Sequence, residues 1–183
     1  IIDSVFSENQ NLLASLNSFM TLNRIISANK NYSEAADVCN FLLHRNINHF
    51  IWINKLANVF VSESEIPDIQ TDHTKCNLGK FIYGEESKRF LKKYPEFSDI
   101  VEAIKEPHKH LHETAKQIIE LYRQKRSEEA YIIYKEKTIP SLELTQEKMM
   151  LIIDKINIIQ NSAKKTMIDT ETESKRISLI ISS

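Results

Sequence analysis

Glycine and proline are scarce in this chain. Its 183 residues include two glycines and four prolines. Glycine weakens a helix interior, and proline removes one of its hydrogen bonds. A chain that avoids both favours long helices joined by few loops. We therefore predict an all-α fold, an antiparallel four-helix bundle with long N- and C-terminal helices, and treat residues 1–183 as one helical domain.

Both glycines fall in one short stretch, residues 76–84, which also holds one of the two cysteines. Glycine is the residue that tolerates unusual backbone dihedrals. We predict that this stretch leaves the regular helical pattern, that Gly79 lets the backbone turn, and that the turn presents the thiol of Cys76 to a site.

Charge is balanced, with 24 basic and 25 acidic side chains and a net charge of -1. This balance gives no electrostatic reason to bind nucleic acid or an anionic membrane surface. The sequence contains no apolar run long enough to span a bilayer. Apolar residues nevertheless stand at both ends, at 1–2 and 177–181. We expect these ends to continue into flanking transmembrane helices; the alternative is that they are ordinary frayed ends, since apolar ends are common.

Two terminal segments carry apolar residues at heptad spacing. Such a stripe suits an internal core or a seam between two chains, and asparagine within it fixes register. Two long helices with matching stripes should pair antiparallel and bring the chain ends together, and we predict a homodimer through them. The first stripe includes Ile2, Phe6, Leu13, Leu16 and Met20, with Asn9 and Asn23, and the second includes Leu142, Met149, Ile152, Ile156, Ile159 and Ala163.

The chain between these stripes divides into helices and connections. We predict a break at residues 29–33 with Ser33 as a cap, a connection over 62–72 and a short extra helix over 85–93. A third helix follows over 95–123, with a kink or break at Pro107 just before His108. The last helix begins at Ser127 and kinks at Pro140.

A set of histidines and one cysteine has the spacing of a metal site. His108 and His112 are four residues apart and share one face of a helix, whereas His110 points away and should be solvated. His49 and Cys76 supply a third imidazole and a thiolate. Three nitrogens and one sulfur form a tetrahedral set that favours Zn²⁺ over harder cations.

The order of these residues resembles the chemoreceptor zinc-binding domain family. The matching segments read His49-Phe50-Ile51-Trp52, Cys76-Asn77-Leu78-Gly79-Lys80-Phe81 and His108-Lys109-His110-Leu111-His112. Phe81 stands where that family usually has tryptophan. The resemblance covers about residues 45–135 and implies that His49, Cys76, His108 and His112 bind zinc.

Several alternatives stay open at this point. His73 forms a rival His-x-x-Cys chelate with Cys76 and could replace His49 as a ligand. Cys39 could form a disulfide with Cys76. Asp72 and Glu113 are candidate acceptors for imidazole N–H groups, and we expect Trp52 to pack beside the site and exclude water.

A zinc ion with four protein ligands has no open position for substrate, so we predict a regulatory domain and not an enzyme. The resemblance implies a sensor domain of a bacterial methyl-accepting chemotaxis protein or of a diguanylate cyclase. The arrangement of the helices favours an extracytoplasmic, periplasmic sensor in the inner membrane, with a cytoplasmic location as the alternative. Zinc loss or oxidation of Cys76 would then act through the C-terminal helix on downstream signalling domains of the same chain. In a second interpretation, zinc is only structural and the bundle binds a small molecule.

Overall fold

The computed structural model describes residues 2–61 and 66–181, and the side chains of residues 12–61 and 66–177. Every regular element in these ranges is helical, so the predicted all-α class is confirmed. The main helices are α1 (Ile2–Ala57), α2 (Asn77–Tyr83), α3 (Glu85–Lys93), α4 (Ser98–Arg123), α5 (Ser127–Ile133) and α6 (Ile139–Ile181). Short helical turns lie at Asn58–Phe60, Pro95–Phe97 and, in π-helical form, Tyr134–Thr138.

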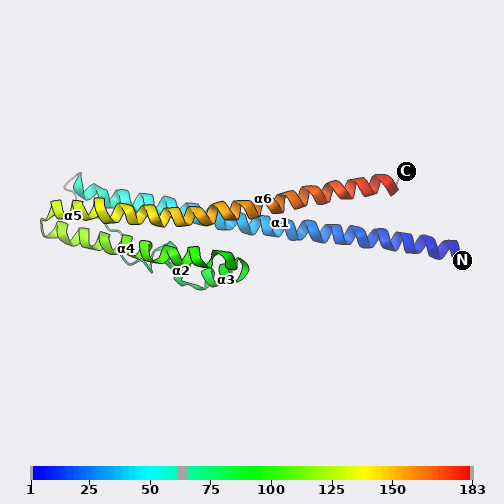
Figure 1. The fold of residues 1–183 in the computed structure, drawn as a ribbon, viewed down its shortest axis with the longest axis horizontal. Coiled ribbons are helices and arrows are strands. Elements are labelled where there is room, and N and C mark those ends of the chain that lie inside the picture. The colour runs from blue at the N-terminus through cyan, green and yellow to red at the C-terminus, as the bar shows by residue number, and fades with distance from the viewer. Residues whose placement is uncertain (1, 62–65, 182–183) are drawn as a thin grey trace. The chain divides into compact units, whose positions relative to one another are not determined.

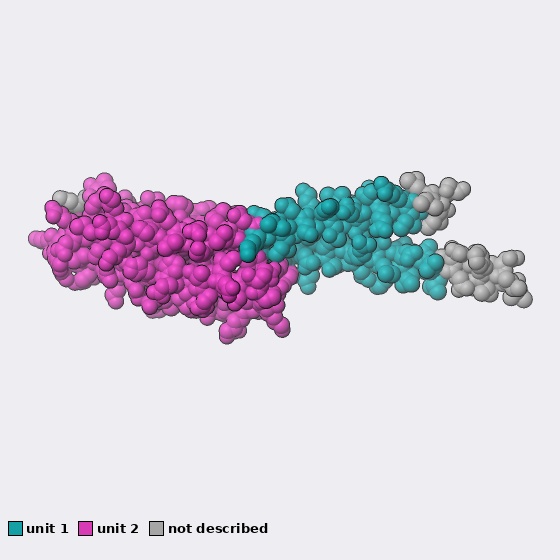
Figure 2. All heavy atoms as spheres, viewed as in Figure 1, with its two compact units in different colours: residues 1–39, 155–183 teal, residues 40–154 magenta. Residues whose placement is uncertain are grey.

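The chain forms two compact units, which Figure 2 colours separately. Unit 1 contains residues 1–39 and 155–183, and unit 2 contains residues 40–154. Helices α1 and α6 contribute to both units, while α2 to α5 belong to unit 2 alone. The segment predicted to bind zinc, residues 45–135, therefore lies entirely within unit 2.

Unit 1 is an antiparallel pair made by the first part of α1 and the last part of α6. Arg24 pairs with Glu173 at 3.5 Å, and the Cys39 thiol donates to Asn157 at 3.4 Å. The residue numbers of these contacts run in opposite directions, so the predicted antiparallel pairing is confirmed in this unit. The start of α1 and the end of α6 consequently lie at one end of this unit (Figure 1).

The two predicted stripes have different outcomes. The second is confirmed as core, since Leu142, Met149, Ile152 and Ile156 are buried. The first does not face α6: the buried or half-buried side of α1 in unit 1 is formed instead by Ala14, Thr21, Ile25, Ala28, Tyr32, Ala35 and Cys39. Leu13, Leu16 and Met20 are exposed. The side chains of Ile2, Phe6, Asn9 and residues 178–181 lie outside the described part.

The breaks considered at residues 29–33 and at Pro107 are not found, since α1 and α4 each continue through these positions. α1 continues through residues 29–33, where Ala28 and Ala35 are buried and maintain the inward face. α4 runs unbroken through Pro107, which forfeits one hydrogen bond while Ile104 and Leu111 on either side are buried. Near Pro140 the helix changes type, because the π-helical turn ends at Thr138 and α6 begins at Ile139.

The core of unit 2 joins α1, α4, α5 and α6. Its centre consists of buried aliphatic side chains from these helices, namely Ile53, Leu56, Leu111, Ala115, Ile118, Ile119, Ala130 and Leu142. Each buried Leu or Ile contributes roughly 1.5–3 kcal/mol relative to an exposed one. This core fixes α1 against α4, the two helices that carry the three clustered histidines.

Candidate metal site

Helix α4 carries the first two residues of the site. His108 and His112 lie one turn apart and are fully buried, with exposed fractions of 0% and 1%. Their ring centroids are 4.8 Å apart at an interplanar angle of 80°. His110, between them in sequence, is exposed as predicted. The i, i+4 spacing therefore does bring two imidazoles together at one buried place.

Helix α1 supplies the third imidazole. His49 is buried, and its ring lies 5.4 Å from that of His108 and 6.0 Å from that of His112, centroid to centroid. Its Nδ1 lies 2.8 Å from the backbone oxygen of Arg45, one turn earlier. A carbonyl oxygen can only accept, so Nδ1 carries the proton and Nε2 keeps its lone pair.

The sulfur comes from Cys76, which caps helix α2. Its backbone is extended, and its Sγ accepts a hydrogen bond from the Gly79 N–H at 3.2 Å, as an N-cap side chain does. The same Sγ lies 3.2 Å from Nε2 of His108. One atom thus holds the start of α2 and faces the histidines of α4.

Gly79 is required for space and not for an unusual backbone angle. Neither glycine has a positive φ, and Gly79 lies inside α2, so the predicted turn at Gly79 is wrong. A Cβ at this position would stand 1.7 Å from the backbone oxygen of His73. The connection that delivers Cys76 is therefore packed directly on the first turn of α2.

Trp52 and His112 share one acceptor in the connection before Cys76. The indole N–H of Trp52 and Nδ1 of His112 both lie 3.0 Å from the backbone oxygen of Gln70. The ring centroids of Trp52 and His112 are 5.0 Å apart, so the predicted packing of Trp52 beside the site is found. Phe81 is buried on the other side of α2, with its ring 5.0 Å from that of Phe41.

Backbone oxygens, and not carboxylates, orient two of the three imidazoles, those of His49 and His112, whereas Nδ1 of His108 is buried without a hydrogen-bond partner among the described residues. Asp72 accepts from Thr74, and Glu113 lies 3.9 Å from Lys109. The predicted roles of these two acids are therefore not found. The oxygens of Arg45 and Gln70 act instead. No sequence signal identifies them, because every residue has such an oxygen.

Burial keeps the three imidazoles in the neutral form that a metal needs. Desolvation, followed by the charges of neighbouring histidines, lowers the pKa of His108 to about 2 and that of His112 to about 4. Burial also lowers the pKa of His49 and raises that of the Cys76 thiol. The N–H groups of Gly79 and Leu78 oppose the change at Cys76, as does the charge of Arg45. The imidazoles are therefore neutral, with lone pairs available to a cation.

The ligand atoms of His49, Cys76, His108 and His112 all lie within 4.8 Å of one another. Zinc bonds of about 2.1 and 2.3 Å at tetrahedral angles would place nitrogen and sulfur about 3.6 Å apart, close to the 3.2 Å found between Cys76 and His108. Nε2 of His112 is buried without a hydrogen-bond partner among the described residues. This orphaned lone pair and the three-nitrogen, one-sulfur donor set fit Zn²⁺.

The alternatives resolve as follows. His73 is outside the four-residue group, and its ring packs 5.6 Å from that of Tyr83. Cys39 and Cys76 are both thiols, so the disulfide considered from the sequence is not formed. Cys39 donates to Asn157 within unit 1, whereas Cys76 belongs to unit 2.

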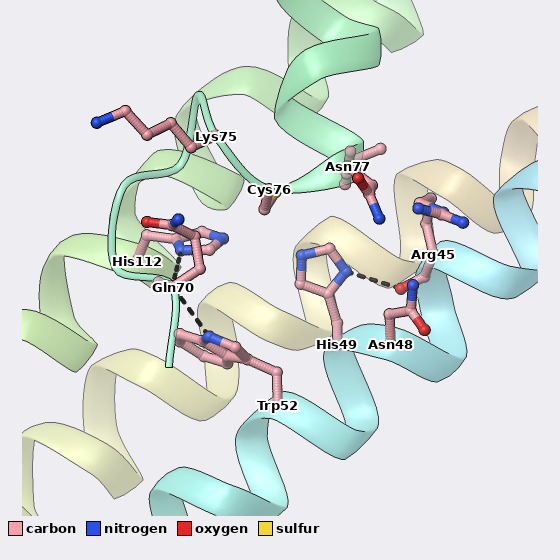
Figure 3. A pocket seen from close by; sticks show the side chains of 10 residues that line it. Arg45, Asn48, His49, Trp52, Gln70, Lys75, Cys76, Asn77 and His112 are labelled. Carbon is pink, nitrogen blue, oxygen red and sulfur yellow. Dashed lines mark hydrogen bonds between the residues drawn. The ribbon is translucent and has the colours of Figure 1, made fainter. Parts of the chain in front are cut away.

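A pocket of about 260 Å³ opens beside the group (Figure 3). Cys76, His49 and His112 line it together with polar side chains, including those of Arg45 and Asn77. Cys76 is half-buried, while the three histidines are buried. Cys76 is therefore the most exposed residue of the group.

Comparison with known proteins agrees with this geometry. The model of the chemoreceptor zinc-binding domain family matches residues 49–119, a range that includes all four residues of the group. Neither curated proteins nor solved structures gave a match. No helix among residues 2–61 and 66–181 combines the length and apolar character needed to cross a bilayer. Residues 49–119 of this chain thus match the chemoreceptor zinc-binding domain family, and the match agrees with a zinc site at the four clustered residues.

Proposed function

We propose that His49, Cys76, His108 and His112 are the zinc ligands of this domain and that Cys76 is its responsive ligand. The observation that supports this most directly is the difference in burial within the group. The histidines are at most 5% exposed, whereas Cys76 is half-buried and lines the pocket. A chelator or oxidant would reach the sulfur first.

The response would begin in the segment around α2. Bound zinc would link α1, the Cys76 connection and α4, and would hold Cys76 as a thiolate. A peroxide would transfer one oxygen atom to this thiolate, giving a sulfenate and water. Cys76 would then lose its role as a ligand and weaken as the cap of α2. The Gln70 carbonyl would in turn be less well placed for Trp52 and His112.

We propose that α6 carries this change to signalling domains of the same chain. α6 is uninterrupted from Ile139 to Ile181, and within unit 2 it packs through Leu142 against the core that holds α1 and α4. A small rearrangement of packed helices is a known way to pass on a ligand state. The proposed class is a sensor domain of a bacterial methyl-accepting chemotaxis protein, without catalytic activity of its own.

The zinc content of the purified chain tests the site. We expect one zinc per chain in the wild type and in His110→Ala, the exposed neighbour, and a large loss in His112→Ala. Hydrogen exchange of the zinc-loaded and chelated forms then tests the response, with faster exchange expected in α2 and α6 after chelation. A metal-free wild type whose melting temperature equals that of His112→Ala would reject the proposal.

A second candidate is a bundle in which zinc is only structural, in a chemoreceptor or a diguanylate cyclase. In that case chelation would destabilise unit 2 and leave the exchange of residues 155–181 unchanged. The same hydrogen-exchange experiment therefore separates the two candidates.

The exposed stripe on α1 supports a homodimer. Leu12, Leu16, Phe19 and Ile26 follow alternating spacings of four and three residues, with Asn23 at the remaining position. Their exposed fractions are 69%, 52%, 61% and 57%. This stripe is on the opposite side of α1 from Ala28 and Ala35. We propose that the same stripe of a second copy covers it, as in a coiled coil.

Location and membrane attachment stay predictions. We propose a periplasmic domain of an inner-membrane protein, because α1 and α6 pair antiparallel in unit 1, as the first and last helices of an extracytoplasmic four-helix sensor would; a cytoplasmic domain is the alternative. Alkaline phosphatase and green fluorescent protein, inserted at the exposed Lys125 turn of the full-length protein, distinguish the two. Phosphatase activity with a dark fluorescent fusion supports the periplasm, and the reverse result places the domain in the cytoplasm.

A further inference from the structure

A second pocket of unit 2 lies beyond the metal site, where α1 and α4 end and α5 begins. Its volume is about 380 Å³, within the rough range of 300–1,000 Å³ typical of small-molecule sites. The walls include the aromatic side chains of Phe60, Tyr122 and Tyr131. Tyr122 follows His112 by ten residues of one helix, or about 15 Å at 1.5 Å per residue. This pocket is therefore separate from the zinc ligands.

The aromatic rings stand at steep angles to one another. The ring of Phe60 lies 5.6 Å from that of Tyr131 at an interplanar angle of 78°. Tyr134 contacts the same Phe60 ring at 5.4 Å and 55°. Rings set at such angles can present a face and edges to one guest. Aromatic faces carry the negative part of the ring quadrupole, which attracts cations.

The ionisable side chains of the pocket also favour a positively charged ligand. Glu128 is its one ionisable acid, and neither lysine nor arginine lines it. Glu128 forms no ion pair among the described residues, whereas the next residue, Glu129, binds Arg126 through two contacts of 2.6 Å. A carboxylate without a cation therefore stands beside three aromatic side chains.

We propose that this pocket binds a small organic cation of the quaternary ammonium class. Such a cation has a low cost of desolvation, a methylated surface that packs on rings, and one positive charge for Glu128. The aromatic part of the lining comes from Phe60, Tyr122 and Tyr131, of which Phe60 and Tyr131 pack edge to face. A metal ion would find only one carboxylate in this lining, and an anion would be repelled by Glu128.

Choline is the probe, and 3,3-dimethylbutan-1-ol is its neutral isostere. The chain is titrated with each in turn while the methyl proton resonance is followed by NMR, because aromatic walls shift a bound methyl group upfield. We expect a saturable upfield shift for choline, with a dissociation constant of about 1 mM. The alcohol should bind at least about three-fold more weakly, since it lacks the cation–π attraction.

Matched variants locate the binding. Tyr131→Leu and Glu128→Gln should each raise the dissociation constant about three-fold, which corresponds to about 0.7 kcal/mol at an exposed site. Glu129→Gln, next in sequence but paired with Arg126, should leave it unchanged. Tyr131 is 52% exposed, and circular dichroism checks that its variant folds. Any of three results would overturn the proposal. The alcohol could bind as tightly as choline, Glu128→Gln and Glu129→Gln could raise the dissociation constant equally, or choline could give no saturable shift up to about 100 mM.

Discussion

The sulfur atom of Cys76 accepts the N–H of Gly79 at 3.2 Å. This hydrogen bond caps α2, and the same atom also faces His108. Cys76 therefore has two roles that a substitution can separate: it holds a helix start through any hydrogen-bond acceptor, and it offers zinc a soft ligand through sulfur only.

Replacing Cys76 by serine and by alanine separates these roles. Serine is a strong N-cap, and alanine is not. In the presence of a chelator, Cys76→Ser should unfold in urea at nearly the wild-type midpoint, whereas Cys76→Ala should lose about 1 kcal/mol of stability. Both should lose zinc affinity. A serine variant with wild-type zinc affinity would show that sulfur is not a ligand.

Gly79→Ala should loosen the connection that delivers Cys76. The new Cβ would meet the His73 oxygen at 1.7 Å, so the connection or α2 must move. We expect zinc affinity to fall about ten-fold or more, as for other groups that position a metal ligand. Titration followed by fluorescence of Trp52, the one tryptophan, measures this.

Gly84→Ala is the comparison for that experiment. Its Cβ would clash with the Lys80 oxygen at 2.2 Å, at the far end of α2 from Cys76. Stability should fall, and zinc affinity should change much less than in Gly79→Ala. Equal losses of affinity would mean that general destabilisation, and not the position of Cys76, accounts for the effect.

The metal-free chain should become less stable as pH falls below about 6.5. The folded-state pKa values of His108 and His112 are lowered to about 2 and about 4, so at mildly acidic pH only the unfolded state binds these protons. Their contribution to stability is complete above the unfolded pKa and is lost as pH falls toward the folded values. Each histidine should contribute a slope of about 1.4 kcal/mol per pH unit between pH 6 and 4.5.

Urea unfolding across this pH range, with a chelator present, measures the slope. His108→Leu, which places an apolar side chain at this buried position, should reduce the dependence of the unfolding free energy on pH by the contribution of one histidine. His110→Ala should leave it unchanged, because His110 is exposed. A wild type and His108→Leu with the same slope would contradict the burial argument.

The exposed stripe of α1 predicts association between chains. Leu16→Glu combined with Phe19→Glu should convert a dimer to a monomer in sedimentation velocity, because two like-charged pairs would face each other. Asn17→Glu adds charge at an exposed position on the other side of α1 from the stripe and should leave the dimer intact. A wild-type chain that stays monomeric at about 100 μM would reject the proposed dimer.

The spacing of His108 and His112, and the order of His49 and Cys76, were enough to predict which side chains meet. Helical periodicity makes such positions readable from sequence. The acceptors of Arg45 and Gln70 were not predictable, because backbone oxygens carry no residue-specific signal. Gly79 was identified for the wrong reason. The sequence shows that a glycine is present, but not that the backbone oxygen of His73 packs against it and leaves no room for a Cβ.

The inward face of α1 in unit 1 was also misassigned. Large residues such as Leu13 and Leu16 dominated the predicted stripe, yet the pair of helices packs through smaller ones, including Ala28 and Ala35. When one helix has two apolar stripes on opposite sides and the number of its partner helices is unknown, the sequence does not show which stripe is buried within the chain.

Zinc-edge X-ray absorption of the full chain tests the central claim most directly. The proposed ligands predict a first shell of three nitrogens at about 2.0–2.1 Å and one sulfur at about 2.3 Å, with no further oxygen. Cys39→Ser should give the same spectrum, because Cys39 donates to Asn157 in unit 1. A shell without sulfur, or one whose sulfur disappears in Cys39→Ser, would contradict the assignment of Cys76 with His49, His108 and His112.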